Sequence, residues 1–251
     1  MIQLICFLLC ISPVTAKESK PTKLAFTFSL PPYLNHDLES GIEFDVIHAA
    51  LLTQEITDLK IQNVHYLRAI DLIKAGRIDL IASNESNQLY SKEVSDMHTS
   101  DTTIYYVDCA ISLANRNLDL KHTGNFNNKR IWAFKSASLS LGQDFQNMAS
   151  ANPNYTEDFD QQKQVDMLAM GRIDIAISDR NIFSHKLHSR DELSESDFRF
   201  TEISSPTARV VRSTNQALIQ QFNEGLASIR ANGTYQKILD KYQKTYSQKC
   251  Q

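Results

Sequence analysis

Residues 72–83 read LIKAGRIDLIAS, and residues 167–178 read MLAMGRIDIAIS. The two stretches share Gly-Arg-Ile-Asp in register, with the tail of a helical pattern before it and an apolar run after it. A glycine that ends a helix, followed by a buried strand, forms one unit of α/β structure. The repeat therefore predicts two lobes of similar build, each with its own sheet. The alternative is one common joint that occurs twice by chance.

The rest of the chain continues this alternation of short strand-like and helical runs, which is typical of α/β proteins. Asp45 is the expected N-cap of the first helix. Strands are predicted at 23–28, 60–66, 78–82, 103–113, 130–134, 198–203 and 208–211, and helices at 46–52, 68–74, 136–148, 161–170, 215–231 and 234–246.

Composition excludes several classes of function. The 251 residues carry a formal net charge of −3, which argues against a general nucleic-acid binder because such proteins need a basic face. The chain contains no apolar run long enough to span a bilayer, no Cys/His spacing suited to a metal, and no G-x-S-x-G, H-E-x-x-H or P-loop motif. We therefore expect no cofactor, no metal and no catalytic residues.

The N-terminus has the pattern of an export signal. Residues 4–11 (LICFLLCI) are apolar and lead to the small-residue exit Val14-Thr15-Ala16, so residues 1–16 are predicted to be cleaved near Lys17. The alternative is a buried N-terminal strand. Cleavage of this segment would remove Cys6 and Cys10 and leave Cys109 and Cys250 in the mature chain. These two could pair in an oxidising compartment, or remain as one buried and one free thiol.

Five landmarks occur in order along the chain: Pro31-Pro32-Tyr33, Gly41-x-x-x-Asp45, Arg68-Ala69 with Gly76 and Asp79, Gly171-Arg172-Ile173-Asp174 with Asp179, and Gly233-Thr234-Tyr235-x-x-Ile238. In these the chain resembles the extracellular solute-binding proteins of family 3, the periplasmic receptors of polar amino-acid ABC importers. The resemblance implies the type II periplasmic-binding-protein fold, in which two crossover strands join two α/β lobes around a ligand cleft. Lobe 1 is then expected at 17–110 and 209–251, and lobe 2 at 111–208, with crossings near 109–113 and 207–211.

The resemblance also implies site residues. Asp179 matches the position that accepts the ligand's ammonium group, and Ser138 matches the hydroxyl and helix start that hold its carboxylate. Each residue has a structural alternative as a simple helix cap. In open α/β sheets ligands bind beyond the carboxyl ends of strands. The polar residues in such positions are Ser83, Asn84, Glu85 and Ser86 after the first repeat, and Ser178 and Asp179 after the second.

One expected feature of the family is missing. The arginine that forks the ligand's carboxylate falls at Ser91, beside Lys92, and no arginine occurs between Arg77 and Arg116. A lysine supplies charge but no planar fork. Arg68 is a possible substitute, or an exposed residue of a first helical turn. Tyr33, Tyr66 and Phe134 could wall the cleft, or pack in the core.

These patterns favour a periplasmic, non-enzymatic, monomeric binding protein that passes a small polar, amine-bearing solute to the membrane permease of an ABC importer. Its cationic nitrogen is expected at Asp179, and any anionic end at Arg68, Lys92 or Ser138. One alternative is a cyclohexadienyl-type dehydratase on the same fold, with Glu85 or Asp179 as general acid. The other is a signalling module that presents ligand to a receptor.

Overall fold

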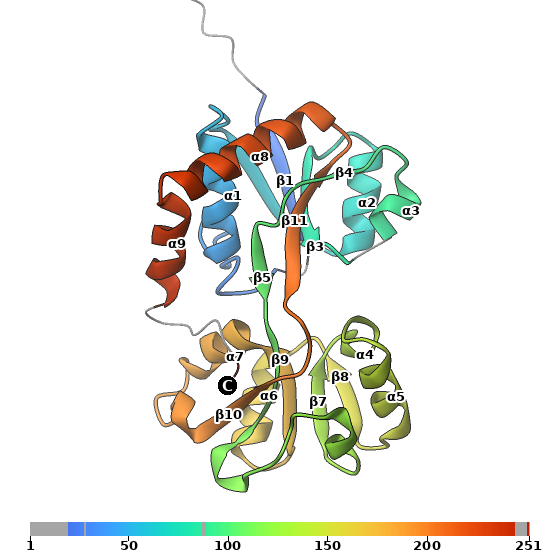
Figure 1. The fold of residues 1–251 in the computed structure, drawn as a ribbon. Coiled ribbons are helices and arrows are strands. Elements are labelled where there is room, and N and C mark those ends of the chain that lie inside the picture. The colour runs from blue at the N-terminus through green and yellow to red at the C-terminus, as the bar shows by residue number, and fades with distance from the viewer. Residues whose placement is uncertain (1–19, 28, 87–88, 244–249, 251) are drawn as a thin grey trace, which may run out of the picture.

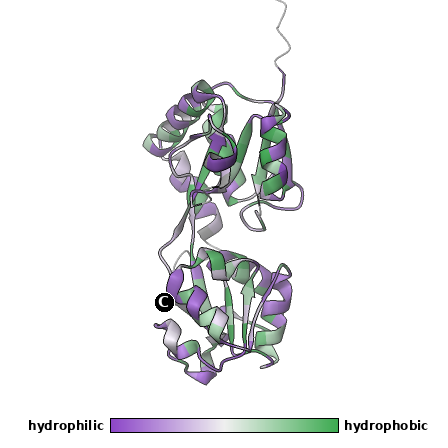
Figure 2. Ribbon diagram, turned by 90° about the vertical axis from the view of Figure 1, so that its right-hand side faces the viewer, coloured by the Kyte–Doolittle hydropathy of each residue, from purple (hydrophilic) through white to green (hydrophobic). Residues whose placement is uncertain are grey.

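The computed structural model describes residues 20–27, 29–86, 89–243 and 250, and the predicted signal segment 1–16 lies outside this part. The chain builds two lobes stacked end to end, each around its own sheet (Figure 1). In both lobes the strands are more hydrophobic than the outward faces of the helices (Figure 2). Two crossover segments run between the lobes (Figure 1).

The first lobe holds a sheet in the order β2-β1-β3-β11-β4, with β5 also paired to β11. Helices α1, α8 and α9 cover one face, and α2 and α3 cover the other (Figure 1). The strands are β1 (Thr22–Thr27), β2 (Leu59–Val64), β3 (Leu80–Asn84), β4 (His98–Thr99), β5 (Ile104–Tyr106) and β11 (Thr207–Ser213), and the helices α1 (Ile42–Leu52), α2 (Tyr66–Lys74), α3 (Leu89–Glu93), α8 (Gln216–Ala231) and α9 (Thr234–Gln243).

The second lobe holds a sheet in the order β10-β6-β9-β7-β8. Helices α4 and α5 pack on one face, and α6 and α7 pack on the other (Figure 1). The strands are β6 (Asp108–Leu113), β7 (Ile131–Phe134), β8 (Tyr155–Asp158), β9 (Ile175–Asp179) and β10 (Phe198–Glu202). The helices are α4 (Ala137–Ser140), α5 (Gln143–Ala151), α6 (Gln161–Ala169) and α7 (Arg180–Leu187), with 3₁₀ turns at Ala114–Arg116, Thr123–Phe126 and Glu195–Asp197.

The repeated Gly-Arg-Ile-Asp motif has the same structure in both lobes. Gly76 and Gly171 end their helices at φ of 62° and 67°, the left-handed region that glycine favours. Asp79 then accepts a hydrogen bond from the backbone N–H of Lys23 at 2.8 Å, where β1 begins. Asp174 accepts one from the backbone N–H of Arg130 at 2.9 Å, just before β7. In each lobe the aspartate of the motif therefore joins the start of the strand that follows it, β3 or β9, to the start of the neighbouring strand, β1 or β7.

Several expected boundaries are corrected. The range 103–113, in which one strand was expected, holds two strands separated by Val107. The chain leaves the first sheet at Val107 and returns through residues 203–206, so the crossings lie just before the expected positions near 109–113 and 207–211. Asp45 is not an N-cap, because α1 already begins after Gly41 and Asp45 lies in its first turn. The helix predicted at 136–148 is interrupted at Gly142, whose φ of 90° is not helical. Strand β8 was not predicted.

A disulfide joins Cys109 in β6 to Cys250 near the C-terminus, with the two Cα atoms 6.1 Å apart. Of the two alternatives that the sequence left open for these cysteines, the structure shows the disulfide. The bond attaches Cys250, which follows α9 in the sequence, to strand β6 of the second lobe.

Candidate functional site

Two aspartates meet at the junction of the lobes. Asp108 is the first residue of β6 after the crossover, and Asp179 is the last residue of β9. The two are directly opposite each other in the antiparallel register of these strands. Their exposed fractions are 8% and 3%. Two acidic side chains are therefore buried side by side at the point where the lobes meet.

Asp179 is fully engaged in hydrogen bonds. Its Oδ1 accepts the backbone N–H groups of Asn181 and Ile182, both at 2.9 Å, so it caps α7. Its Oδ2 accepts the N–H of Val107 at 2.8 Å and the hydroxyl of Tyr33 at 3.0 Å. The helix-cap alternative raised by the sequence is thus present, together with a direct bond from the first lobe.

The electrostatics of the pair favour the neutral, protonated form of each carboxyl. Burial, and then the nearby charge of Asp179, raise the pKa of Asp108 to about 7. Burial raises the pKa of Asp179 to about 6, although the hydrogen bonds that Asp179 accepts act to lower it. Neither carboxyl has an ion-pair partner within the described residues. Burial also raises the pKa of Tyr33 well above its ordinary value, so its hydroxyl stays a donor.

The backbone amides at the start of α4 already hold a carboxylate, and it belongs to the protein. Glu157 on β8 accepts the N–H of Ser136 and the N–H of Ser138, both at 2.8 Å. Tyr155 donates its hydroxyl to the same carboxylate at 2.8 Å. Although partial burial works against the charge, hydrogen bonds from Ser138 and its neighbours hold the pKa of Glu157 below its usual range. The amides expected to bind a ligand carboxylate are thus already bonded to the side chain of Glu157.

The first lobe contributes a buried ion pair that sequence reasoning missed. Arg209 on β11 donates to both oxygens of Glu43, at 2.8 and 3.0 Å, and to Oδ1 of Asn84 at 2.7 Å. The two charged side chains are 2% and 0% exposed. Tyr106 lies beside the pair and donates to Glu43 at 3.3 Å. Asn84, at the end of β3, is therefore held in place by Arg209.

The other predicted residues are distributed differently from expectation. Ser83 is buried and accepts a hydrogen bond from Arg212 at 3.1 Å, so it belongs to the interior. Tyr33 is buried and stacks on Tyr106 with ring centroids 3.9 Å apart, and it also lines a cavity between the lobes together with Asn181. Half-buried Tyr66 contacts the ring of His65. Four predicted residues are exposed: Arg68, Glu85, Ser86 and Lys92.

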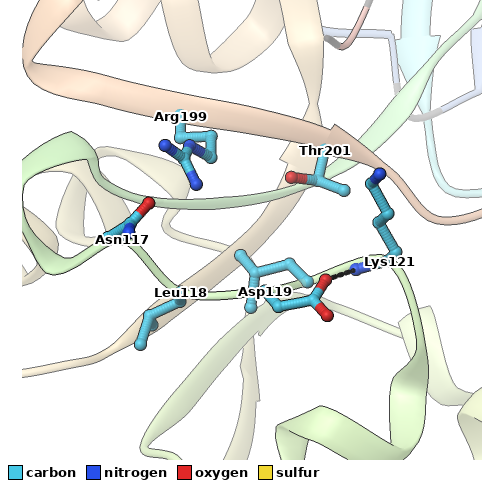
Figure 3. Close-up of a pocket in the computed structure, with 7 residues that line it drawn as sticks. Asn117, Leu118, Asp119, Lys121, Arg199 and Thr201 are labelled. Carbon is cyan, nitrogen blue, oxygen red and sulfur yellow. Dashed lines mark hydrogen bonds between the residues drawn. The ribbon is translucent and has the colours of Figure 1, made fainter.

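A separate cavity of about 460 Å³ lies in the second lobe between residues 117–121 and β10. Figure 3 shows Arg199 and Thr201 from β10 across from Asn117 and Lys121 of the loop. All its walls come from one lobe, and it includes none of the predicted site residues. The lobe junction is therefore the better candidate site.

Two further features bear on the class of protein. In the described part of the chain, no helix has the length and apolar character needed to cross a bilayer. The same part contains no cluster of three or more potential metal-ligating side chains.

Comparison with known proteins gives a consistent result. The chain is 25% identical over 233 residues to the ABC transporter arginine-binding protein 1 of Escherichia coli K12, covering 90% of this chain and 92% of that protein. Two solved structures share the fold. One is an ABC uptake transporter substrate-binding protein of Streptococcus pneumoniae with bound histidine (TM-score 0.67, 18% identity, 90% of this chain and 92% of that one). The other is a histidine kinase sensor domain similar to periplasmic binding proteins (TM-score 0.69, 13% identity, 89% and 96%). Residues 23–245 match the family described as bacterial extracellular solute-binding proteins, family 3, and the chain belongs to that family.

Proposed function

We propose that this protein binds a small organic cation, with an ammonium or guanidinium group seated at Asp108 and Asp179, and delivers it to the permease of an ABC importer. The proposal is supported most directly by the register that buries these two carboxyls side by side, with no ion-pair partner among the described residues. A buried carboxylate is costly unless a positive group accompanies it. A cationic solute supplies that group. The arginine-binding relative is consistent with this class of solute.

The same geometry disfavours a free carboxylate on the solute. Glu157 occupies the amides of Ser136 and Ser138, and its negative charge repels a second carboxylate there. The arginine expected near Ser91 is also absent from the sequence. An amine without a carboxylate therefore fits this site better than an α-amino acid does.

The remaining parts of the proposal concern the context of binding. Residues 1–16 act as a cleaved export signal, and the mature monomer works in the periplasm. The two lobes, which are joined at Val107 and at residues 203–206, close on the solute. The solute is released unchanged, as binding proteins of the family release theirs. Because one protein of the same fold is a kinase sensor domain, an uptake assay with labelled solute in a deletion strain separates import from signalling.

A thermal-shift comparison tests the proposal. The probes are agmatine, which is arginine without its carboxylate, then L-arginine and L-glutamate, all at pH 8. We expect agmatine to raise the melting temperature most, and glutamate not at all. A ligand at 100 times its Kd adds about 2.7 kcal/mol to the folded state. Stabilisation by glutamate alone, or equal stabilisation of Asp108→Asn and wild type by agmatine, would contradict the proposal.

A further inference from the structure

Tyr33 reaches the carboxyl pair from the opposite lobe. It lies between β1 and α1 of the first lobe, whereas Asp179 ends β9 of the second. The Tyr33 hydroxyl donates to Oδ2 of Asp179 at 3.0 Å, and its oxygen accepts the Nδ2–H of Asn181 at 3.2 Å. All three side chains are buried. Because Asn181 donates to the hydroxyl oxygen, the hydroxyl proton is directed at Asp179.

The hydrogen bonds that Asp179 accepts divide by origin. Oδ1 accepts the backbone N–H groups of Asn181 and Ile182, which belong to its own helix α7. Oδ2 accepts the N–H of Val107, at the crossover, and the hydroxyl of Tyr33. An ionised carboxylate has about four acceptor positions, and these donors fill them. A proton on Asp179 would therefore have to replace one of the donors.

Asp108 has a different environment. Burial and the charge of Asp179 raise its pKa, and no hydrogen bond reaches its carboxyl within the described residues. Because hydrogen bonds to the ionised form favour ionisation, the first negative charge of the pair belongs on Asp179. The pKa values, about 6 for Asp179 and about 7 for Asp108, have this order. The other titratable groups that face Asp179 are Tyr33 and Tyr106, whereas Arg180, the next residue, forms an ion pair elsewhere.

The ring of Tyr33 is held within the first lobe. It stacks on Tyr106 with ring centroids 3.9 Å apart and an angle of 21° between the planes. Tyr106 donates to Glu43 at 3.3 Å, and the guanidinium carbon of Arg209 lies 4.9 Å from the centroid of its ring. The buried ion pair of the first lobe thus fixes Tyr106, and Tyr106 supports Tyr33. The bond from Tyr33 to Asp179 is consequently present only when the two lobes are docked.

We propose that Tyr33, held as a donor by Asn181, directs the negative charge of the carboxyl pair to Asp179 and leaves the proton with Asp108. Tyr33 is then a positioning residue of the cation site, an inference that rests on the proposed function for the identity of the solute. Movement of the first lobe away from Asp179 removes this donor and makes the carboxyl harder to ionise. The charge offered to a cation is therefore linked to the docking of the lobes.

Carbon-13 NMR of the full-length protein tests the charge assignment without any solute. Aspartate is labelled at the carboxyl carbon, and the two signals are assigned from Asp108→Asn and Asp179→Asn. We expect Asp179 to ionise before Asp108 as pH rises. In Tyr33→Phe the pKa of Asp179 should rise by about one pH unit, because one hydrogen bond to the ionised form is lost.

Two further variants sharpen this measurement. Tyr90→Phe removes a buried hydroxyl that makes no hydrogen bond within the described residues, and it should leave the pKa of Asp179 unchanged. Asn181→Leu keeps the Tyr33 hydroxyl but removes the group that orients it, and it should raise that pKa by a smaller amount than Tyr33→Phe. The proposal is overturned if Asp108 ionises first, if Tyr33→Phe leaves the pKa of Asp179 unchanged, or if Tyr90→Phe raises it equally.

Agmatine binding gives a second readout, because a cation requires an ionised carboxylate. The affinity of wild type should fall as pH drops through the ionisation of the pair. In Tyr33→Phe this fall should begin about one pH unit higher, while the affinity at pH 8.5 stays within about threefold of wild type. A loss of affinity that is equal at every pH indicates structural damage alone and overturns the proposal. If agmatine does not bind but the pKa of Asp179 moves as expected, the role of Tyr33 is supported and the proposed function is contradicted.

Discussion

Asp108 and Asp179 face each other across two antiparallel strands at the lobe junction, and both are more than nine-tenths buried. Two carboxyls in such a position resist simultaneous ionisation, because burial and mutual repulsion both favour the neutral form. An incoming cation reverses that balance. Under the proposed function, a cationic solute therefore favours the ionised form of both carboxyls.

The pair predicts an unusual dependence of stability on pH. The folded-state pKa values are about 7 for Asp108 and about 6 for Asp179, above the unfolded value near 3.8. The folded state thus binds more protons between about pH 4 and pH 7, and the free energy of unfolding attributable to these groups falls as pH rises through that window. Urea denaturation of the unliganded protein at pH 5 and pH 8 should show this loss.

Asp108→Asn should remove much of this effect. The amide carries no charge to bury, so at pH 8 the variant should be more stable than wild type by about 1–3 kcal/mol. Asp144→Asn, which changes an exposed aspartate of the same lobe, is the matched control and should leave the pH profile unchanged. A variant that is less stable than wild type at pH 8 would show that Asp108 is charged and satisfied in the folded protein.

Glu157 should set the preference between amines and amino acids. In Glu157→Ser the amides of Ser136 and Ser138 lose their internal carboxylate. The affinity for arginine relative to agmatine should then rise by about tenfold, because the carboxylate of Glu157 no longer occupies these amides and free amides favour an anion. The ratio of the two Kd values by calorimetry measures this. A ratio unchanged from wild type would show that Glu157 is not part of the binding site.

The Glu43–Arg209 pair should be essential for stability. Glu43→Gln leaves a buried guanidinium without its partner and should reduce the free energy of unfolding by about 3–5 kcal/mol. Glu39→Gln, an exposed change nearby, should have little effect. The double variant Glu43→Leu with Arg209→Met should be less destabilised than Glu43→Gln. If the double variant is destabilised more than Glu43→Gln, the ion pair itself stabilises the fold, and the loss in Glu43→Gln is not due only to an unpaired buried charge.

Reduction of the Cys109–Cys250 disulfide should destabilise the protein by about 2–5 kcal/mol, because the bond closes a very long loop in the unfolded chain. Cys250→Ser should reproduce the effect without a reductant. The measurement is urea denaturation with and without dithiothreitol. Insensitivity of wild type to the reductant would show that the bond does not form in solution.

The fold was accessible from sequence because its signals are local. The Gly-Arg-Ile-Asp motif recurs where a helix must stop and a buried strand must begin, and Asp79 and Asp174 make the same bond in each lobe. Family landmarks then supplied the order of the lobes. Boundaries were less accessible: an apolar run such as 103–113 carries no mark of the point at which the chain changes sheets, apart from Asp108 as its one charged residue.

The site was less accessible because its chemistry is not local. Glu43 and Arg209 are 166 residues apart, and the local sequence around either residue contains no pattern that predicts a buried ion pair. Glu157 was missed together with its strand β8. Asp179 was found through the family position, but its bond to Tyr33 spans the two lobes and depends on how they dock. Charged residues within predicted apolar strands, such as Asp108, are the signal that could have been followed.

The central claim is that a cation binds at the Asp108–Asp179 pair, and proton release on binding tests it most directly. Agmatine is titrated calorimetrically at pH 6.5 in two buffers of different ionisation enthalpy, and again at pH 8.5. Because a cation favours ionised carboxyls whose pKa values lie near 6 and 7, binding should release protons at pH 6.5 and almost none at pH 8.5. Asp108→Asn should weaken binding by about 30-fold or more at pH 8.5 and diminish the release at pH 6.5. Binding without proton release at pH 6.5, or with an affinity unchanged in Asp108→Asn, would contradict the assignment.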